Sequence, residues 1–301
     1  MSEPRTVAQL LALGERVLSD STHLFEDHDH RREAEELLAF VLEADPEDLE
    51  DLEDDREVGS RDAQHFLSLI ARRAGGEPFP HLTGHIEFYG LDLEVKPGPF
   101  VPRPSSELTV DRAVRRLRKR ADPVVVDVCT GAGPIALAIA DELSSAEVWG
   151  TDIDRDGLAQ GRRNAKRLGI PNVRFQASDM YDGLPARLRD NVDVITGHVP
   201  YVPPDELDDL PAEVREHEPL HTLTDESDDG LSLMRKAIAE APRWLKPGGW
   251  LLLEISDDLE HKVRRLCREA GLEDKGAASD SDGLSIVVEA RRSRRSADGA
   301  R

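Results

Sequence analysis

Hydrophobic residues recur at helical spacing along the first quarter of the chain. Two sets each share one face of a predicted helix: Val7, Leu10, Leu11 and Val17 in the first, and Ala34, Leu37, Leu38 and Val41 in the second. A third helix is predicted from Asp62 to Arg73, and Gly75-Gly76 is typical of a helix end. The pattern predicts a small helical domain over residues 1–78.

The periodicity changes after this domain. From His81 to Phe100 apolar and polar residues alternate, and the turn Lys96-Pro97-Gly98-Pro99 indicates a β-hairpin. We therefore expect residues 79–103 to form a hairpin linker. A helix can begin after Pro104, with Ser105 or Ser106 as its N-cap.

Strands and helices then alternate as far as residue 290. Strands are predicted near residues 124–129, 147–152, 172–176, 191–196, 249–255 and 284–290, and helices at 134–143, 154–168, 230–245 and 257–271. This order predicts an α/β domain over residues 104–290 with a mainly parallel, doubly wound, Rossmann-like sheet. Residues 291–301 contain an Arg-Arg-Ser-Arg-Arg run and are expected to form a disordered basic tail.

The overall charge restricts the partners. The chain has 61 acidic residues against 39 Lys and Arg, which gives a net charge of -22. Such a surface argues against broad binding to nucleic acid or to an anionic membrane. We expect no direct nucleic acid contact and no membrane contact, and any partner is expected to be reached through protein contacts.

The cysteine content points to a reducing compartment. Cys129 and Cys267 are too few for a disulfide framework or a cysteine-based zinc site. The first residues lack a basic start followed by a long apolar core, and no apolar run approaches the length of a membrane span. We expect a cytoplasmic protein, and the sequence leaves its oligomeric state open.

A glycine turn between a strand and a helix indicates a nucleoside site. The apolar run Val124 to Cys129 enters Thr130-Gly131-Ala132-Gly133, where glycines let the backbone approach a ligand. The next strand ends at Asp152, whose carboxylate can accept hydrogen bonds from ribose hydroxyls. A dinucleotide fingerprint has the same pattern, so these two strands alone leave NAD and S-adenosylmethionine open.

A proline-rich corner follows the fourth strand of the sheet. Residues 192–195 run into His198-Val199-Pro200-Tyr201, at the end of the sheet where ligands of open α/β sheets lie. The corner resembles the Asn-Pro-Pro-Tyr corner of amino- and amide-N-methyltransferases, in which the Asn side chain and the next carbonyl hold the nitrogen that receives the methyl group. His198 stands at the Asn position.

From about Arg32 to Glu289 the chain resembles the release-factor glutamine N5-methyltransferases of the PrmC/HemK type. The similar blocks are Phe79 to Gly84, Glu87 to Gly90, Phe100 to Glu107, Asp127 to Ala138, Val214 to Leu220, Asp229 to Leu231 and Leu252 to Glu254. The resemblance implies a helical substrate-recognition domain, a hairpin linker and a class I methyltransferase domain. It also implies S-adenosylmethionine as cofactor and the Gln of a Gly-Gly-Gln motif in peptide chain release factors as substrate. His198, Ser256 and Pro134 depart from the family pattern.

Several residues are expected to form the site. The catalytic corner is His198, Val199, Pro200 and Tyr201; the cofactor residues are Asp127, Thr130, Gly131, Gly133, Asp152, Ile153, Asp179 and Met180; the substrate residues are Arg103, Glu107, His198 and Tyr201. Structural roles stay open for four of these. Asp127 can stabilise the glycine loop, Asp179 can cap a turn, and Arg103 with Glu107 can tie the linker to the domain by an ion pair. Glu254 is predicted to be structural.

The histidine at the corner leaves the acceptor open. A neutral imidazole offers one acceptor nitrogen and can also take a proton, so His198 suits amide methylation or a substrate that needs a general base. The alternatives are a methyltransferase for a small molecule or another side chain, a catalytically inactive binding protein, and, less consistent with the corner, an NAD dehydrogenase. The histidines near residues 23–30 and at His217 and His221 are assigned no metal.

Overall fold

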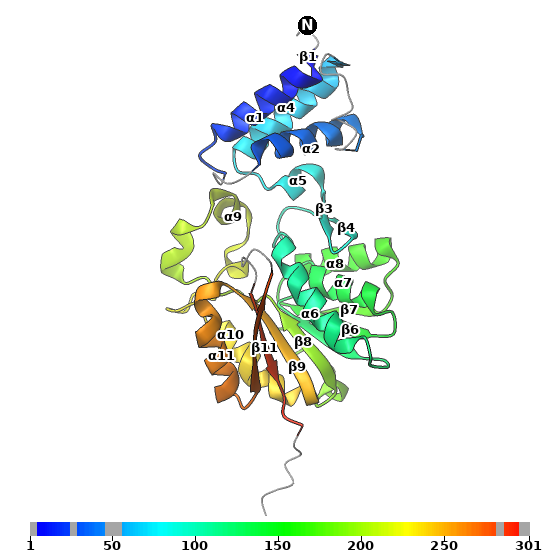
Figure 1. The fold of residues 1–301 in the computed structure, drawn as a ribbon, viewed down its shortest axis with the longest axis vertical. Helices are drawn as coiled ribbons and strands as arrows, with labels where there is room; N and C mark the ends of the chain where they lie inside the picture. Colours follow the sequence, from blue (N-terminus) through cyan, green and yellow to red (C-terminus); the bar gives the residue numbers. More distant parts are fainter. Residues whose placement is uncertain (1–4, 25–28, 46–55, 281–285, 295–301) are drawn as a thin grey trace, which may run out of the picture. The chain divides into compact units, whose positions relative to one another are not determined.

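The computed structural model describes residues 5–24, 29–45, 56–280 and 286–294. The chain divides into two compact units (Figure 1). The first contains the described residues up to His85 together with Asp208–Glu218, and the second contains Ile86–Leu207 and the residues from Pro219 onward. The predicted tail lies mostly outside the described residues. None of the described helices is long and apolar enough to cross a membrane.

The first unit is a bundle built on three helices, as the hydrophobic spacing predicts. They are α1 (Val7–Ser19), α2 (His30–Leu42) and α4 (Ser60–Ala74). Their inner faces meet in one apolar core that includes Leu10, Leu37 and Phe66. Two short strands, β1 (Arg5–Thr6) and β2 (Glu57–Val58), pair antiparallel beside it. The unit also holds α5 (Phe79–Thr83) and α9 (Ala212–His217).

A buried arginine joins the helical bundle to the inserted segment Asp208–Glu218. Arg73 is 1% exposed, and its guanidinium pairs with Glu33 at 2.9 Å and with Glu213 at 2.6 Å. It also donates to the carbonyl of Glu77 at 3.1 Å. Glu213 lies 140 residues along the chain from Arg73. The segment therefore belongs to the helical unit, although the residues before and after it in the sequence belong to the second unit.

Arg73→Met is expected to destabilise the helical unit by about 3–5 kcal/mol, because it removes the buried cation that pairs with both carboxylates. Hydrogen exchange of the peptides from α1, α2 and α4 measures this loss. Tryptophan fluorescence would not report it, because Trp149, Trp244 and Trp250 all lie in the second unit. Arg72→Met is the matched control. The Arg72 side chain is 48% exposed in its pair with Glu77, so its loss should cost about 0–1 kcal/mol. Equal protection in the two variants would contradict the role assigned to Arg73.

The hairpin forms earlier than the sequence pattern suggests. Its strands are β3 (His85–Phe88) and β4 (Leu91–Glu94). The turn is Tyr89-Gly90, where both residues have positive φ, 51° and 76°. Positive φ at both central residues is the geometry of the tight hairpin turn that follows strand twist. The prediction that Lys96–Pro99 forms the hairpin turn is therefore wrong, because these residues follow the second strand.

The second unit contains the predicted, mainly parallel sheet. Its seven strands have the order β10-β11-β9-β8-β5-β6-β7. They are β5 (Val124–Val128), β6 (Glu147–Asp152), β7 (Val173–Ala177), β8 (Val192–Gly197), β9 (Leu245–Ile255), β10 (Glu273–Ser279) and β11 (Ile286–Arg291). β11 is antiparallel to both of its neighbours. The sequence pattern missed β10, because this edge strand carries no buried residue.

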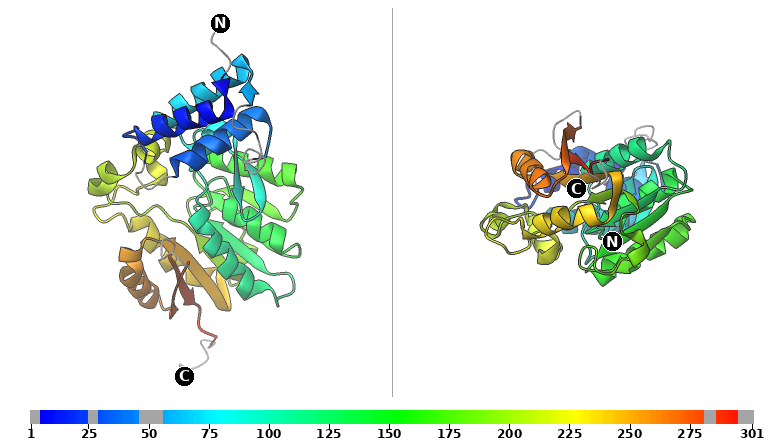
Figure 2. Two further views of the ribbon diagram at one scale, coloured as in Figure 1. Left: turned by 45° about the horizontal axis from the view of Figure 1, so that its top comes forward. Right: turned by 90° about the horizontal axis from the view of Figure 1, so that it is seen from below.

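Helices cover both faces of this sheet (Figures 1 and 2). Val124, Val126 and Val128 pack with α10 (Ser232–Glu240) and α11 (Glu260–Glu269) on one face. Val125 packs on the other face, with the helices α6 (Glu107–Leu117), α7 (Pro134–Glu142) and α8 (Arg155–Leu168). The predicted helix 230–245 ends at Glu240, since Pro242 lies in the turn that follows and Leu245 already begins β9.

Candidate active site

Three strand ends bring the predicted site residues to one edge of the sheet. Val128, the last residue of β5, pairs with Thr151 of β6 and with Gly197 of β8. All three strands are parallel, so the loops that follow them emerge at the same edge. The glycine turn, the carboxylate after β6 and the corner after β8 are therefore neighbours.

The glycine turn has the shape that a ligand needs. Gly131 has a φ of +55°, and apart from its chain neighbours no atom of the described residues lies within 4 Å of the position where a Cβ would be. Its N–H donates to Asp152 Oδ2 at 2.7 Å. Gly133 has a φ of +81°, and a Cβ there would meet the Phe175 ring at 2.3 Å. Pro134 occupies the first position of α7, where its missing N–H costs nothing.

Asp152 and Ile153 fit a nucleoside. Each oxygen of the Asp152 carboxylate accepts one backbone N–H, from Gly131 and from Asp154. A carboxylate has about four lone-pair sites, so acceptor capacity is left for ribose hydroxyls. Burial raises the pKa of Asp152, and the two N–H donors oppose this. Ile153 beside it is 59% exposed, and its contact with a base stays a prediction.

Asp127 is enclosed between two threonines. Thr130 Oγ1 donates to its Oδ2 at 2.5 Å, and Thr196 Oγ1 donates to its Oδ1 at 2.7 Å. Asp127 thus connects the glycine turn to the strand that leads into the corner. Burial raises its pKa to about 6, although both hydroxyls favour the ionised form. These contacts correspond to the loop-stabilising role that the sequence left open, while the cofactor role stays a prediction.

The raised pKa of Asp127 predicts a pH dependence of stability. A carboxyl that holds its proton more tightly in the folded state favours folding below its ordinary pKa of 3.8, and this contribution is lost as the pH rises through about 6. Asp127→Asn lacks the group, so its free energy of unfolding should rise relative to wild type by about 3 kcal/mol across this window. Urea unfolding followed by tryptophan fluorescence measures both proteins. Parallel pH curves would contradict the prediction.

Asp179 and Met180 follow β7 at the same edge. The Asp179 carboxylate pairs with Lys236 Nζ of α10 at 2.6 Å. Met180 is 4% exposed and lies in the core, with Cys129 Sγ 3.9 Å from its sulfur. An acceptor role for Asp179 toward adenine therefore competes with this ion pair and stays a prediction.

The corner after β8 holds an aromatic stack. The ring of His198 stacks on Tyr201, with centroids 5.8 Å apart and planes at 21°. The Phe100 ring meets the imidazole edge-on, with centroids 5.7 Å apart. Val199 is fully buried. Burial, together with the nearby charge of Glu254, raises the pKa of Tyr201 to about 12, so its hydroxyl keeps its proton at neutral pH.

Residues that the sequence did not assign to the site lie behind His198. The imidazole Nδ1 is 3.4 Å from Ser106 Oγ and 3.6 Å from Glu254 Oε2. Ser105 Oγ donates to the other oxygen of Glu254 at 2.9 Å. Ser106 is the N-cap residue of α6, as predicted, but its side chain makes no cap hydrogen bond to the helix. The hydroxyls bond to the corner and to Glu254 instead.

Arg103 and Glu107 contact the linker region of the second unit. The Arg103 guanidinium lies 4.5 Å from the centre of the Phe100 ring that packs on His198. Glu107 Oε1 accepts the N–H of Tyr89, at the turn of the hairpin, at 2.6 Å. Glu107 thus ties the hairpin to the domain through the backbone. Substrate binding by either residue stays a prediction.

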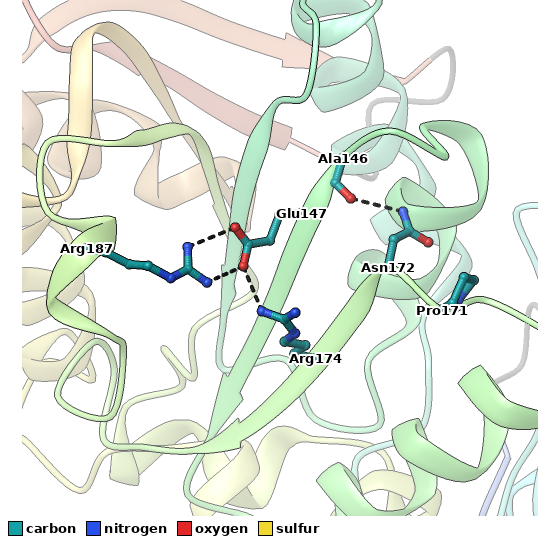
Figure 3. Close-up of a pocket in the computed structure, with 6 residues that line it drawn as sticks. All are labelled: Ala146, Glu147, Pro171, Asn172, Arg174 and Arg187. Atoms are coloured by element: carbon teal, nitrogen blue, oxygen red, sulfur yellow. Dashed lines mark hydrogen bonds and ion pairs between the residues drawn. The ribbon is translucent and has the colours of Figure 1, made fainter.

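A surface pocket of about 390 Å³ lies away from these residues (Figure 3). It is lined by Ala146, Glu147, Pro171, Asn172, Arg174 and Arg187. Arg174 and Arg187 both point at the carboxylate of Glu147 and pair with it. Glu147 is the first residue of β6, so the pocket is at the opposite sheet edge from the corner. Its charged groups already pair with one another, and it holds none of the predicted site residues.

No group of three histidine, cysteine, aspartate or glutamate side chains among the described residues could hold a metal ion. Glu26, Asp27 and His28 of the histidine-rich segment lie outside the described residues.

Two family models match the chain. The model described as a methyltransferase domain matches residues 119–290, and the model described as the PrmC N-terminal domain matches residues 6–84. Each overlaps one of the two predicted domains, with bounds that differ from the predicted ones.

Curated relatives agree with these matches over most of the chain. A release factor glutamine methyltransferase of Geobacter sulfurreducens is 34% identical over 258 residues, which cover 86% of this chain and 88% of the relative. One from Bordetella pertussis is 38% identical over 222 residues, which cover 74% of this chain and 80% of the relative.

Solved structures resemble the fold. A methyltransferase from Pyrococcus furiosus has a TM-score of 0.51 at 20% identity and covers 78% of this chain and 100% of its own. A 16S rRNA N2 G1207 methyltransferase of T. thermophilus, in complex with AdoMet and guanosine, has a TM-score of 0.50 at 20% identity and covers 69% of this chain and 49% of its own. At this identity the likeness concerns the fold alone.

Proposed function

Since the chain belongs to the release factor glutamine methyltransferase family, we propose that it transfers a methyl group from S-adenosylmethionine to the side-chain amide of a glutamine in a peptide chain release factor. The family resemblance and the class I methyltransferase fold expected from the sequence are confirmed by these matches. The observation that carries the proposal is the position of the His198 corner, at the sheet edge that also holds the glycine turn and Asp152.

Residues of the second unit would hold the cofactor. Asp152 would accept the ribose hydroxyls, Ile153 would cover one face of the adenine, and the backbone at Gly131 would leave room for close approach. When bound, S-adenosylmethionine supplies an electrophilic methyl group. The enzyme then has to align a nucleophile with it and exclude water.

The corner would align the amide. An amide nitrogen is a weak nucleophile because its lone pair is delocalised into the carbonyl. Two acceptors that hold both N–H bonds help to localise that lone pair toward the methyl group. His198 and the carbonyl of Val199 would be these acceptors, and Tyr201, stacked on the imidazole, would form the wall against which the planar amide packs.

The expected partner is a protein, and the expected compartment is the cytoplasm. The relatives are named for action on release factors, which fits a protein substrate for this chain. Both cysteines are free thiols, Cys267 buried and Cys129 partly buried. The net charge of -22 favours recognition of the factor through protein surface and not through bound nucleic acid.

Methyl transfer can be tested directly. The full chain is incubated with methyl-labelled S-adenosylmethionine and the release factors of its host, and peptide mass spectrometry locates the label. We expect one methyl group on the glutamine of the Gly-Gly-Gln motif and none on a factor whose motif glutamine is replaced by alanine. Cofactor binding without transfer to either protein would contradict the proposed substrate and favour a small-molecule acceptor or an inactive binding protein.

A further inference from the structure

One buried acceptor beside the corner has no donor among the described residues. Glu254 is 3% exposed, and its Oε1 accepts the hydroxyl of Ser105. Its Oε2 is fully covered, and nothing in the described part of the chain donates to it. The nearest imidazole nitrogen is His198 Nδ1, at 3.6 Å. Leaving a buried charged acceptor unsatisfied costs more than leaving a neutral one unsatisfied.

An N–H on Nδ1 would satisfy this oxygen. Active-site hydrogen bonds are often long before substrate binds and shorten in the complex, so 3.6 Å is within reach of a small adjustment. The Ser106 hydroxyl, 3.4 Å from the same nitrogen, does not dictate the tautomer because it can donate or accept. The carboxylate can only accept. The arrangement therefore favours the tautomer with the proton on Nδ1 and the lone pair on Nε2.

We propose that Glu254 is a positioning residue that fixes His198 in this tautomer, so that Nε2 holds one N–H of the substrate amide and takes its proton during methyl transfer. The proposal rests on the proposed function for the identity of the substrate. The amide nitrogen forms a bond to the methyl carbon as the carbon–sulfur bond breaks, the sulfur leaves as a neutral thioether, and the excess proton moves to Nε2. Glu254 stabilises the imidazolium that results.

This role separates the chain from relatives with the asparagine corner. An asparagine oxygen accepts an N–H bond but cannot take the proton, so the product proton must leave by another route. The titratable and charged groups that face His198 are Glu254 from β9 and Tyr201 from the corner, with Arg103 stacked on the adjoining Phe100. Tyr201 keeps its own proton at neutral pH, so it does not compete with the imidazole for the proton of the amide.

Nitrogen-15 NMR of the full chain labelled at its ten histidines reads the tautomer without any substrate. His198→Asn assigns the signal by its loss. We expect a protonated Nδ1 and an unprotonated Nε2 in the wild type. The reverse tautomer in the wild type, with Ser106 donating to Nδ1, would overturn the proposal.

Glu254→Gln tests the positioning role. The substitution replaces a carboxylate that can only accept with an amide whose NH₂ group can donate to Nδ1 and so reverse the tautomer. We expect kcat to fall by about 10²-fold or more with an unchanged affinity for the cofactor. Glu289→Gln is the matched control, since Glu289 is an equally buried glutamate on β11 that pairs with Arg112 and Arg116. Glu289→Gln should leave the His198 signal in place. An unchanged tautomer and an unchanged rate in Glu254→Gln would overturn the proposal.

The pH dependence tests proton acceptance. The wild-type rate should fall on acidification, because a protonated imidazole cannot take the proton of the amide. The rate of His198→Asn should not show this acidic decrease. Two parallel profiles would show that the imidazole takes no proton. The tautomer result is independent of the acceptor, so a confirmed tautomer without methylation of a release factor would contradict only the proposed function.

Discussion

His198→Ala is expected to lower kcat for release factor methylation by about 10²- to 10³-fold. The variant removes one of the two acceptors that would hold the amide, and it also removes the ring on which Tyr201 stacks. The loss should appear mainly in kcat, because the contact with the amide strengthens as the nitrogen gains charge. Single-turnover kinetics with labelled cofactor measure it.

His198→Asn is the informative companion. It introduces the asparagine of the Asn-Pro-Pro-Tyr corner that this corner resembles and keeps one acceptor oxygen, so its kcat should stay within about tenfold of the wild type. Cofactor affinity should be similar in all three proteins, because the glycine turn and Asp152 are not touched. If His198→Ala transfers methyl groups at the wild-type rate, the corner is not the catalytic site.

The second large effect is expected at Gly230, which packs against the backbone of the corner. This glycine has a φ of +64°, and a Cβ there would lie 2.5 Å from the carbonyl oxygen of Tyr201 and 2.9 Å from the backbone of Val202 and Pro203. All of these neighbours are backbone atoms, so Gly230→Ala must displace the corner. A misplacement of about 1 Å costs about 10²-fold in rate. We expect this loss in kcat while the cofactor still binds.

Gly169→Ala provides the matched control. Gly169 has a similar φ of +70° at the end of α8, but no atom lies within 4 Å of its added Cβ. It should show only the backbone strain, about 1 kcal/mol in stability, and normal kinetics. Similar kinetics in the two variants would show that contact between Gly230 and the corner does not set the rate. Calorimetric titration with the cofactor separates a displaced corner from a collapsed site.

The sequence predicted those parts of the site that local pattern encodes. The valine run before Thr130, the glycines and the proline corner each carry their signal within ten residues, and the sheet edge brings them together. The placement of Glu254 needed the order of strands as well. In the parallel β8–β9 pair Gly197 lies opposite Leu253. The next residues along the two strands, His198 and Glu254, are therefore neighbours. A parallel β8–β9 pair, had it been assumed, would have predicted this contact.

Other contacts had no signal in the sequence. Ser105 and Ser106 precede a helix and therefore fit the N-cap pattern, yet their partners are 149 and 92 residues away. A side chain that can bond to its own backbone or to a distant group is decided by tertiary packing. The polar edge strand β10 was missed because it has no strong apolar period. The turn at Tyr89-Gly90 was missed because the alternation from His81 to Phe100 does not mark where the chain reverses.

The pairing of Arg73 with Glu213 has a consequence for synthesis on the ribosome. The three-helix bundle is complete in the nascent chain early, but the carboxylate that completes its buried ion cluster is made 140 residues later. At about 5–20 residues per second, this interval lasts on the order of ten seconds. During that time Arg73 can pair with Glu33, which has already been made, but not with Glu213. The helical unit therefore reaches its final stability only after much of the second unit has emerged.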